Sequence, residues 1–155
     1  MPHVPGLRSP YAKVGRLVYF GRMLDKIRLH AAGKLPADYR ENLGDTKPGM
    51  FDTRLCAFLR VDFKSIQARV AQGGTDEEIL AWAEAKGGRR TDEECYVWSG
   101  FLMKRGWHDS ADAVQRLRDR VAESGLQDKP IQTFFDYIDF DEGRDPVKER
   151  SWEKT

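Results

Sequence analysis

The chain has few cysteines, no long apolar run and almost no net charge, and each of these absences excludes a class of protein. Its two cysteines, Cys56 and Cys95, lie in apolar helical patterns, which is typical of buried reduced thiols and argues against a disulfide scaffold. No apolar run approaches the roughly 20 residues of a membrane span, so no membrane partner is expected. The N-terminus has no basic stretch followed by an apolar core, so we expect no secretion signal and a cytoplasmic location.

Basic and acidic residues nearly cancel, since 26 lysines and arginines accompany 25 aspartates and glutamates. The resulting net charge of +1 provides no overall field for nucleic acid, so nucleic acid is not an expected partner. The three histidines are scattered without zinc spacing, and no nucleophile motif or phosphate-binding loop is present. We therefore expect no metal and no cofactor, and the absence of catalytic motifs argues against an enzyme.

Two matching segments carry the strongest local signal in the chain. Residues 75–82 and residues 91–98 both begin Thr-Asp-Glu-Glu and both end in tryptophan. A threonine at a helix N-cap accepts a hydrogen bond from the N3 amide, and a glutamate at N3 reaches back to the cap amide. Between the copies, Gly87 and Gly88 supply a residue that adopts positive φ and ends the first helix. The pattern predicts two short helices joined by a tight turn.

Glycines follow most of the other periodic apolar segments, as expected at helix ends. Ser9 and Pro10 predict the start of a first helix that runs to about Ala32. This helix is apolar over most of its circumference and is therefore expected at the centre of the fold. Further helices are expected over 50–60, from Asp62 to Gly73, over 75–86, over 91–105, from Asp109 or Ser110 to Gly125, and from Pro130 onward.

No hairpin signal accompanies these segments, so the predicted fold class is all-α. We expect a single compact helical domain, residues 1–155, of about six to seven short-to-medium helices around the central N-terminal helix. Within it, residues 1–8 are expected to form an arm, residues 34–49 a long loop and residues 146–155 a mobile tail.

The most informative polar group is the cluster Arg22, Asp25, Lys26 and Arg28 on the first predicted helix. Asp25 is three positions from each arginine, so one carboxylate can face two guanidinium groups. Charges on a mostly apolar helix are retained when they pair with one another or when they bind a ligand. Two interpretations follow: an internal ion-pair network, which we favour, or an arginine-lined pocket for a carboxylate or phosphate. In the second, Tyr19 or His30 would carry protons.

Three other charged segments favour structural interpretations. Gly87-Gly88-Arg89-Arg90 precedes a helix, but three acids in that helix's first turn would repel an anion. The acidic run 136–145 fails the EF-hand pattern and predicts a charged helix end in which Arg144 pairs locally. Arg116, Arg118 and Arg120 occur together with acids, Asp119 among them, and predict a solvated helix face.

A further signal comes from five segments considered together. They are Leu7-Arg8-Ser9-Pro10, Gly15-x-Leu17-Val18-Tyr19, Arg22-Met23-Leu24-Asp25-Lys26-x-Arg28, Phe58-Leu59-x-Val61-Asp62 and Gly74-Thr75-Asp76-Glu77-Glu78-Ile79-Leu80-Ala81-Trp82. Over roughly residues 7–145 the chain resembles the bacterial family described as domain of unknown function 5069. The resemblance implies a small soluble bacterial protein and carries over no activity, ligand or partner.

Two function classes stay open at this point. The first is a binding or interaction module for a macromolecular partner or a small anion, which the absence of catalytic motifs favours. The alternative is a small enzyme or ligand-binding protein with a pocket around Arg22, Asp25 and Arg28. A concave pocket at the first helix would favour the alternative, whereas a flat exposed apolar patch would favour a partner surface. The oligomeric state is open.

Overall fold

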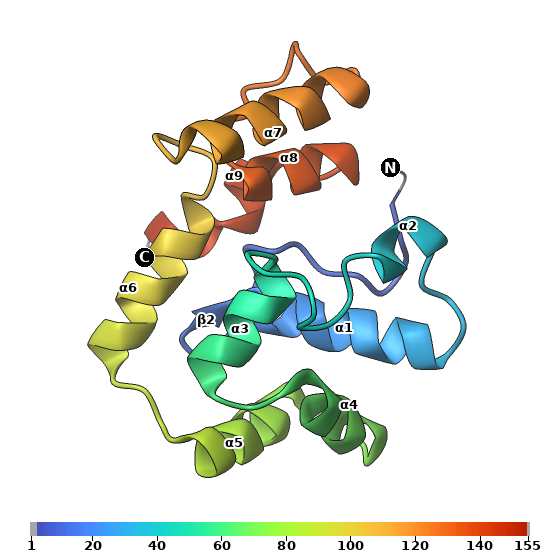
Figure 1. Ribbon diagram of the computed structural model, residues 1–155, viewed down its shortest axis with the longest axis vertical. Helices are drawn as coiled ribbons and strands as arrows, with labels where there is room; N and C mark the ends of the chain where they lie inside the picture. The colour runs from blue at the N-terminus through green and yellow to red at the C-terminus, as the bar shows by residue number, and fades with distance from the viewer. Residues whose placement is uncertain (1–2, 155) are drawn as a thin grey trace.

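The structure is a computed structural model that describes residues 3–154, and this part of the chain is predominantly helical (Figure 1). In chain order the described elements are β1 (Lys13–Val14), β2 (Leu17–Val18), α1 (Phe20–Ala31), α2 (Ala37–Arg40), α3 (Phe51–Leu59), α4 (Phe63–Ala71), α5 (Asp76–Gly87), α6 (Asp92–Met103), α7 (Ala111–Glu123), α8 (Phe134–Asp141), α9 (Pro146–Glu149) and the 3-10 helix η1 (Ser151–Lys154). Among these elements, no helix is long and apolar enough to cross a bilayer.

The first helix begins at Phe20, so the predicted start at Ser9 is wrong. Residues 13–18 instead form an antiparallel hairpin, which corrects the expectation that no strand is present. Gly15 has a φ of +58° in the turn, a conformation that costs glycine little. Ser9 does not cap a helix; its hydroxyl donates to the Asp139 carboxylate at 2.9 Å. With the hairpin and the short C-terminal helices, the described residues hold nine α-helices rather than six or seven.

Helix α1 lies at the centre of the fold, as the sequence predicts. Every residue from Phe20 to Ile27 is buried. Helices α3, α4 and α5 pack around α1 on one side, while α7 and α8 lie on the other, and α6 runs along the outside between the two groups (Figure 1). The core joins side chains from the hairpin, α1, α3, α4, α5, α6 and α8. A central α1 therefore carries polar side chains toward both groups of helices.

Both matching Thr-Asp-Glu-Glu segments are helix starts. The Thr75 hydroxyl accepts from the Glu78 amide at 3.2 Å, and the Thr91 hydroxyl accepts from the Glu94 amide at 3.1 Å. Only the second forms a complete capping box among the described contacts, because the Glu94 carboxylate also accepts from the Thr91 amide at 3.0 Å. The two predicted helices are confirmed as α5 and α6.

The N-terminal segment is anchored on α8 by buried polar contacts. Tyr11 donates to Asp136 at 2.7 Å, next to the contact between Ser9 and Asp139. Arg144 pairs with Asp139 at 3.4 Å, as the sequence predicts for the acidic run. The two carboxylates are therefore held inside the protein by its own donors.

Two segments expected to lack regular structure contain short helices. Residues 34–49 include α2, which places Tyr39 in the interior. Residues 146–154 form α9 and η1, and the Trp152 indole donates to the Tyr11 carbonyl at 3.2 Å. The Lys13 ammonium lies 3.7 Å from the centre of the Trp152 ring. Residues 1, 2 and 155 of the expected arm and tail lie outside the described residues.

Candidate functional site

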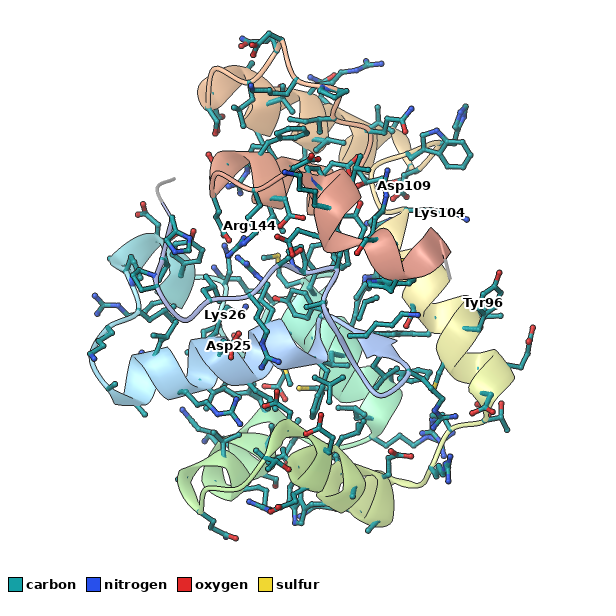
Figure 2. The ribbon with its side chains drawn as sticks, turned by 180° about the vertical axis from the view of Figure 1, so that it is seen from behind. Asp25, Lys26, Tyr96, Lys104, Asp109 and Arg144 are labelled. Carbon is teal, nitrogen blue, oxygen red and sulfur yellow. The ribbon has the colours of Figure 1, made fainter. Side chains whose placement is uncertain are left out.

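The polar side chains of α1 divide between two surroundings. Asp25 and Lys26 are neighbours on this helix, but their partners come from different parts of the chain (Figure 2). Tyr19, Arg22 and Lys26 lie beside α2, α3 and α8, where the structure has a pocket. Asp25 and Arg28 lie beside residues 8 and 76 instead. The single cluster expected from the sequence is therefore divided between different partners, and a bond from Arg22 to the Arg8 carbonyl at 2.9 Å links the two sides.

Arg22 forms a buried two-bond ion pair with Glu142, which follows α8. Its Nη1 and Nη2 atoms lie 2.9 Å and 2.6 Å from the two carboxylate oxygens. Tyr39 of α2 donates to the same carboxylate at 2.9 Å. Burial alone would raise the pKa of Glu142, but the bonds and charge of Arg22, with the bonds from Arg144 and Tyr39, outweigh it and hold this pKa below its usual value. The expected pairing of Arg22 with Asp25 is wrong, since Glu142 takes that place.

Lys26 is held in a second buried network. Its Nζ donates to the Asp52 carboxylate at 2.7 Å, to the Tyr19 hydroxyl at 2.8 Å and to the Asn42 carbonyl at 3.1 Å. Burial lowers the pKa of Lys26, and the Asp52 carboxylate opposes this shift. Tyr19 also donates to Asp52 at 2.7 Å and has a φ of +69°, a strained conformation for an aromatic residue. All three ammonium protons are used inside the protein.

Asp25 pairs chiefly with Arg8 from the N-terminal segment. It accepts from the Arg8 Nε at 2.8 Å, from Nη2 at 3.0 Å and from the backbone amide at 3.0 Å. Arg28 lies 3.8 Å from Asp25 and donates to Asp76 at 2.8 Å. The predicted proximity of Asp25 and Arg28 is therefore present, and Arg8 and Asp76 complete the network. His30 is exposed in the last turn of α1, outside the lining of the pocket.

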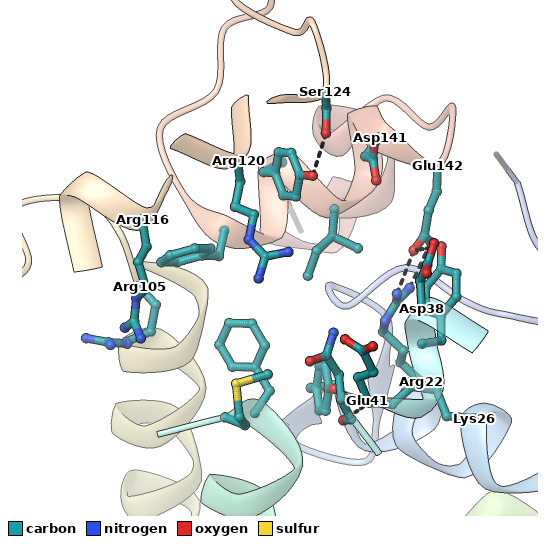
Figure 3. A pocket seen from close by; sticks show the side chains of 18 of the residues that line it. Arg22, Lys26, Asp38, Glu41, Arg105, Arg116, Arg120, Ser124, Asp141 and Glu142 are labelled. Carbon is teal, nitrogen blue, oxygen red and sulfur yellow. Dashed lines mark hydrogen bonds and ion pairs between the residues drawn. The ribbon is translucent and has the colours of Figure 1, made fainter. Parts of the chain in front are cut away.

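The pocket has a volume of about 480 Å³ and lies between two walls (Figure 3). One wall comes from α1, α2 and the start of α3, and the other comes from α7, α8 and Arg105. Five basic side chains line it: Arg22, Lys26, Arg105, Arg116 and Arg120. Five acidic side chains line it as well: Asp38, Glu41, Glu123, Asp141 and Glu142. Between the charges, Phe51, Phe134 and Ile138 supply an apolar surface.

Some charged side chains of the pocket are not engaged by other described side chains, and they come from both walls. Arg120 of α7 extends its guanidinium into the hollow, with Arg116 one turn earlier on the same helix (Figure 3). Within the described residues neither arginine makes a hydrogen bond or ion pair, whereas Arg105 pairs with Asp109. Across the hollow stand Asp38 and Glu41, which are also without such contacts among the described residues (Figure 3). Among the described residues, two unpaired bases thus face two unpaired acids across the pocket, although the wall of α7 and α8 also carries the acids Glu123 and Asp141.

Sequence reasoning assigned Arg116 and Arg120 to a solvated helix face and so missed them as pocket residues. Both side chains are indeed exposed. Their four-residue spacing places them on one side of α7, next to the inward-facing Leu117. That spacing was the available signal, but the wall opposite them belongs to α2, far away in the sequence.

Residues 3–154 contain no cluster of side chains suited to bind a metal ion. No three histidine, cysteine, aspartate or glutamate side chains in this range come close enough together to hold an ion. Asp136 and Asp139, the acids that first suggest a metal, accept hydrogen bonds from Tyr11 and Ser9. Cys56 is buried, and burial raises the pKa of its thiol to about 12.

The comparisons with known proteins agree with the resemblance of the five segments. No curated protein matches the chain. A family model described as domain of unknown function (DUF5069) matches residues 4–144, which include the hairpin, α1 and every residue of the two pocket walls. The chain therefore belongs to the DUF5069 family.

Proposed function

We propose that this protein binds a small molecule in the pocket between α1–α3 and α7–α8. The observation that carries the proposal is the Arg120 guanidinium, which points into a hollow of about 480 Å³ without an internal acidic partner among the described residues. This volume lies within the roughly 300–1,000 Å³ of small-molecule sites. Arginine forms two parallel hydrogen bonds with a carboxylate or phosphate, so an anionic group on the ligand is favoured.

The charge balance supports a ligand that also carries a positive group. Five acids offset five bases in the lining, so a simple anion gains no net attraction from the pocket as a whole. Arg116 and Arg120 are on one wall and Asp38 and Glu41 on the other, so a ligand with an anion at one end and an amine at the other matches both. The apolar side chains between the walls suit a short hydrocarbon chain.

The proposal assigns binding rather than catalysis. Tyr19 and Lys26, two pocket residues whose chemistry suits proton transfer, are both held by Asp52. Burial also raises the pKa of Tyr19 well above its ordinary value, which keeps the phenol protonated. Arg22 is likewise engaged with Glu142. These residues form a rigid floor, and the free groups on the walls would select the ligand.

Three probes of equal chain length test the proposal by thermal shift and calorimetry. Glutarate carries two anions, cadaverine two cations, and δ-aminovalerate one of each. We expect δ-aminovalerate at millimolar concentration to raise the melting temperature most, because its two ends match the charges on both walls. A ligand at 100 times its Kd adds about 2.7 kcal/mol to the free energy of unfolding. Natural amino acids extend the same panel.

Variants on α7 provide the matched control. Arg120→Gln should abolish the shift, whereas Arg118→Gln should keep it, because Arg118 is exposed on the same helix but does not line the pocket. Absence of binding by every probe would contradict the proposal. Equal weakening by the two substitutions would contradict it as well, since it would point to a general charge effect.

A further inference from the structure

The outer face of α6 presents apolar side chains to solvent. Tyr96 is 76% exposed, Val97 59% and Phe101 47%, although these residues belong to a helix whose other face is buried. Tyr96 and Lys104 project away from the body of the protein (Figure 2). A helix face with an apolar centre and charged ends is typical of a contact surface.

Residues on the outer face of α6 follow a regular line. Glu93, Val97, Gly100 and Lys104 have the spacing i, i+4, i+7, i+11 and therefore share one stripe along the helix, continuing into its C-cap. A Cβ added to Gly100 would meet nothing within 4 Å, so the stripe has an open notch at this position. Tyr96 and Phe101 stand on either side of the stripe and provide aromatic surface.

We propose that this stripe binds the same stripe on a second copy of the chain, with the two α6 helices antiparallel. A two-fold axis level with the point midway between residues 98 and 99 places Glu93 level with Lys104 of the second copy. The same axis places Val97 level with the notch at Gly100 of the second copy. Each of these pairs occurs twice in the dimer because of the two-fold symmetry. The contact therefore involves two copies only, and no residue of the stripe faces the same residue of the second copy.

Charge complementarity argues for the second copy and for its direction. The start of α6 carries the exposed acids Glu93 and Glu94, and its C-cap is the exposed base Lys104, whereas Asp92 and Arg105 are paired within the chain. A parallel pair would bring acid against acid and base against base, whereas an antiparallel pair matches them. The guanidinium of Arg54 lies 5.3 Å from the centre of the Phe101 ring and adds to the basic end.

The dimer should be weak. The stripe covers three turns of one helix, so it buries less surface than the roughly 1,200–2,000 Å² of a stable interface. The rim ion pairs add direction more than affinity. We therefore expect monomer and dimer to exchange at micromolar to millimolar chain concentrations. The stripe is separate from the lining of the pocket, so this inference does not depend on the proposed ligand.

Sedimentation equilibrium over a range of concentrations, with charge-swapped variants, tests the contact. Glu93→Lys and Lys104→Glu should each weaken dimerisation about tenfold, because each turns two attractive pairs into repulsive ones. The double variant with both substitutions should recover the affinity of the parent. Lys64→Glu on α4 is the control and should leave dimerisation unchanged, since Lys64 is exposed and α4 lies on the other side of the molecule from α6 (Figure 1).

Two results would overturn the proposal. A chain that stays monomeric at millimolar concentration has no such contact. A double variant that stays as weak as the single variants would show that Glu93 and Lys104 do not face each other. Circular dichroism on each variant checks that α6 is intact, which is expected because both positions are exposed.

Discussion

Arg22 of α1 and Glu142 after α8 are joined by two hydrogen bonds of 2.9 Å and 2.6 Å inside the protein. They are 120 positions apart in the chain, and both side chains are at most 5% exposed. The pair connects the central helix to the C-terminal helices and forms part of the pocket floor. A buried ion pair of this kind sets how the two halves of the fold meet.

The first prediction concerns that pair. Glu142→Gln leaves the Arg22 guanidinium buried without a carboxylate, and breaking a buried pair from one side costs about 3–5 kcal/mol. Urea unfolding should show this loss, whereas the exposed Glu123→Gln should lose little. The double variant Arg22→Met, Glu142→Leu should recover part of the stability, because it removes both charges of the pair, while Arg144, which also binds Glu142, keeps its contact with Asp139. A loss below 1 kcal/mol for Glu142→Gln would show that the pair is not a buried constraint.

The second prediction concerns pH and Asp139. Burial raises the pKa of Asp139 to about 7 from an ordinary 3.8, although the hydrogen bond from Ser9 and the charge of Arg144 lower it. Between these two values the folded chain holds a proton that the unfolded chain releases. The contribution of Asp139 to stability therefore falls as pH rises from about 4 to 7, by about 1.4 kcal/mol per pH unit.

The variant Asp139→Asn isolates this contribution, because asparagine resembles the protonated acid and does not titrate. The stability of the parent minus that of the variant should decrease from pH 4 to pH 7 and level off above it. Urea unfolding at several pH values measures the difference, and other titrating groups cancel in it. A difference that is constant with pH would show that Asp139 is ionised throughout.

The positions of most helices could be predicted from the sequence because their signals are local. Thr75 and Thr91 cap helices with atoms three residues away, so no knowledge of the fold is needed. The hairpin at residues 13–18 could not be found in this way, since strands of two residues show no alternation. Ser9-Pro10 has the sequence of a helix start, but the hydroxyl of Ser9 donates a hydrogen bond to Asp139, which belongs to a helix far away in the sequence.

The site was predicted only in part, because local spacing along one helix does not show which distant residues contact it. Spacing on one helix correctly placed Asp25 near Arg28, at 3.8 Å. It could not show that Arg22 turns to Glu142, because that contact depends on how α8 docks on α1. Likewise, Arg120 belongs to a pocket only because α7 lies across from α2. Long-range packing decides which charges on a helix surface are paired and which are free.

The third prediction concerns the caps of α5 and α6. Thr75→Ala and Thr91→Ala should each lower the free energy of unfolding by about 1 kcal/mol. The two losses should be similar, because the bond from the backbone amide of residue 91 to Glu94 survives Thr91→Ala. Serine at either position should be nearly silent, since its hydroxyl accepts the same bond. Calorimetry that finds both alanine variants equal to the parent would refute the importance of the caps.

The fourth prediction concerns Gly87 at the end of α5. A Cβ at this position would lie 1.8 Å from the carbonyl oxygen of Leu59, which is backbone and cannot rotate away. Gly87→Ala must therefore separate α5 from the end of α3, at a cost of about 3 kcal/mol. Gly100→Ala is the matched control, because it is also helical and its Cβ meets nothing within 4 Å. In dilute solution the control should be neutral or slightly stabilising.

The last prediction distinguishes a structural network from an anion site at Asp25. This carboxylate accepts three hydrogen bonds from Arg8, whose side chain is 35% exposed, so Asp25→Asn should cost about 2 kcal/mol rather than the full penalty of a buried pair. Asp76 also binds Arg8 and Arg28, so the losses from Asp25→Asn and Asp76→Asn should not add. The measurement is thermal unfolding of Asp25→Asn with and without millimolar phosphate at matched ionic strength. A structural network predicts a loss that phosphate does not reverse, because Asp76 still engages both arginines. Recovery of the parent's stability in phosphate would instead show that the two arginines bind an anion when Asp25 is removed.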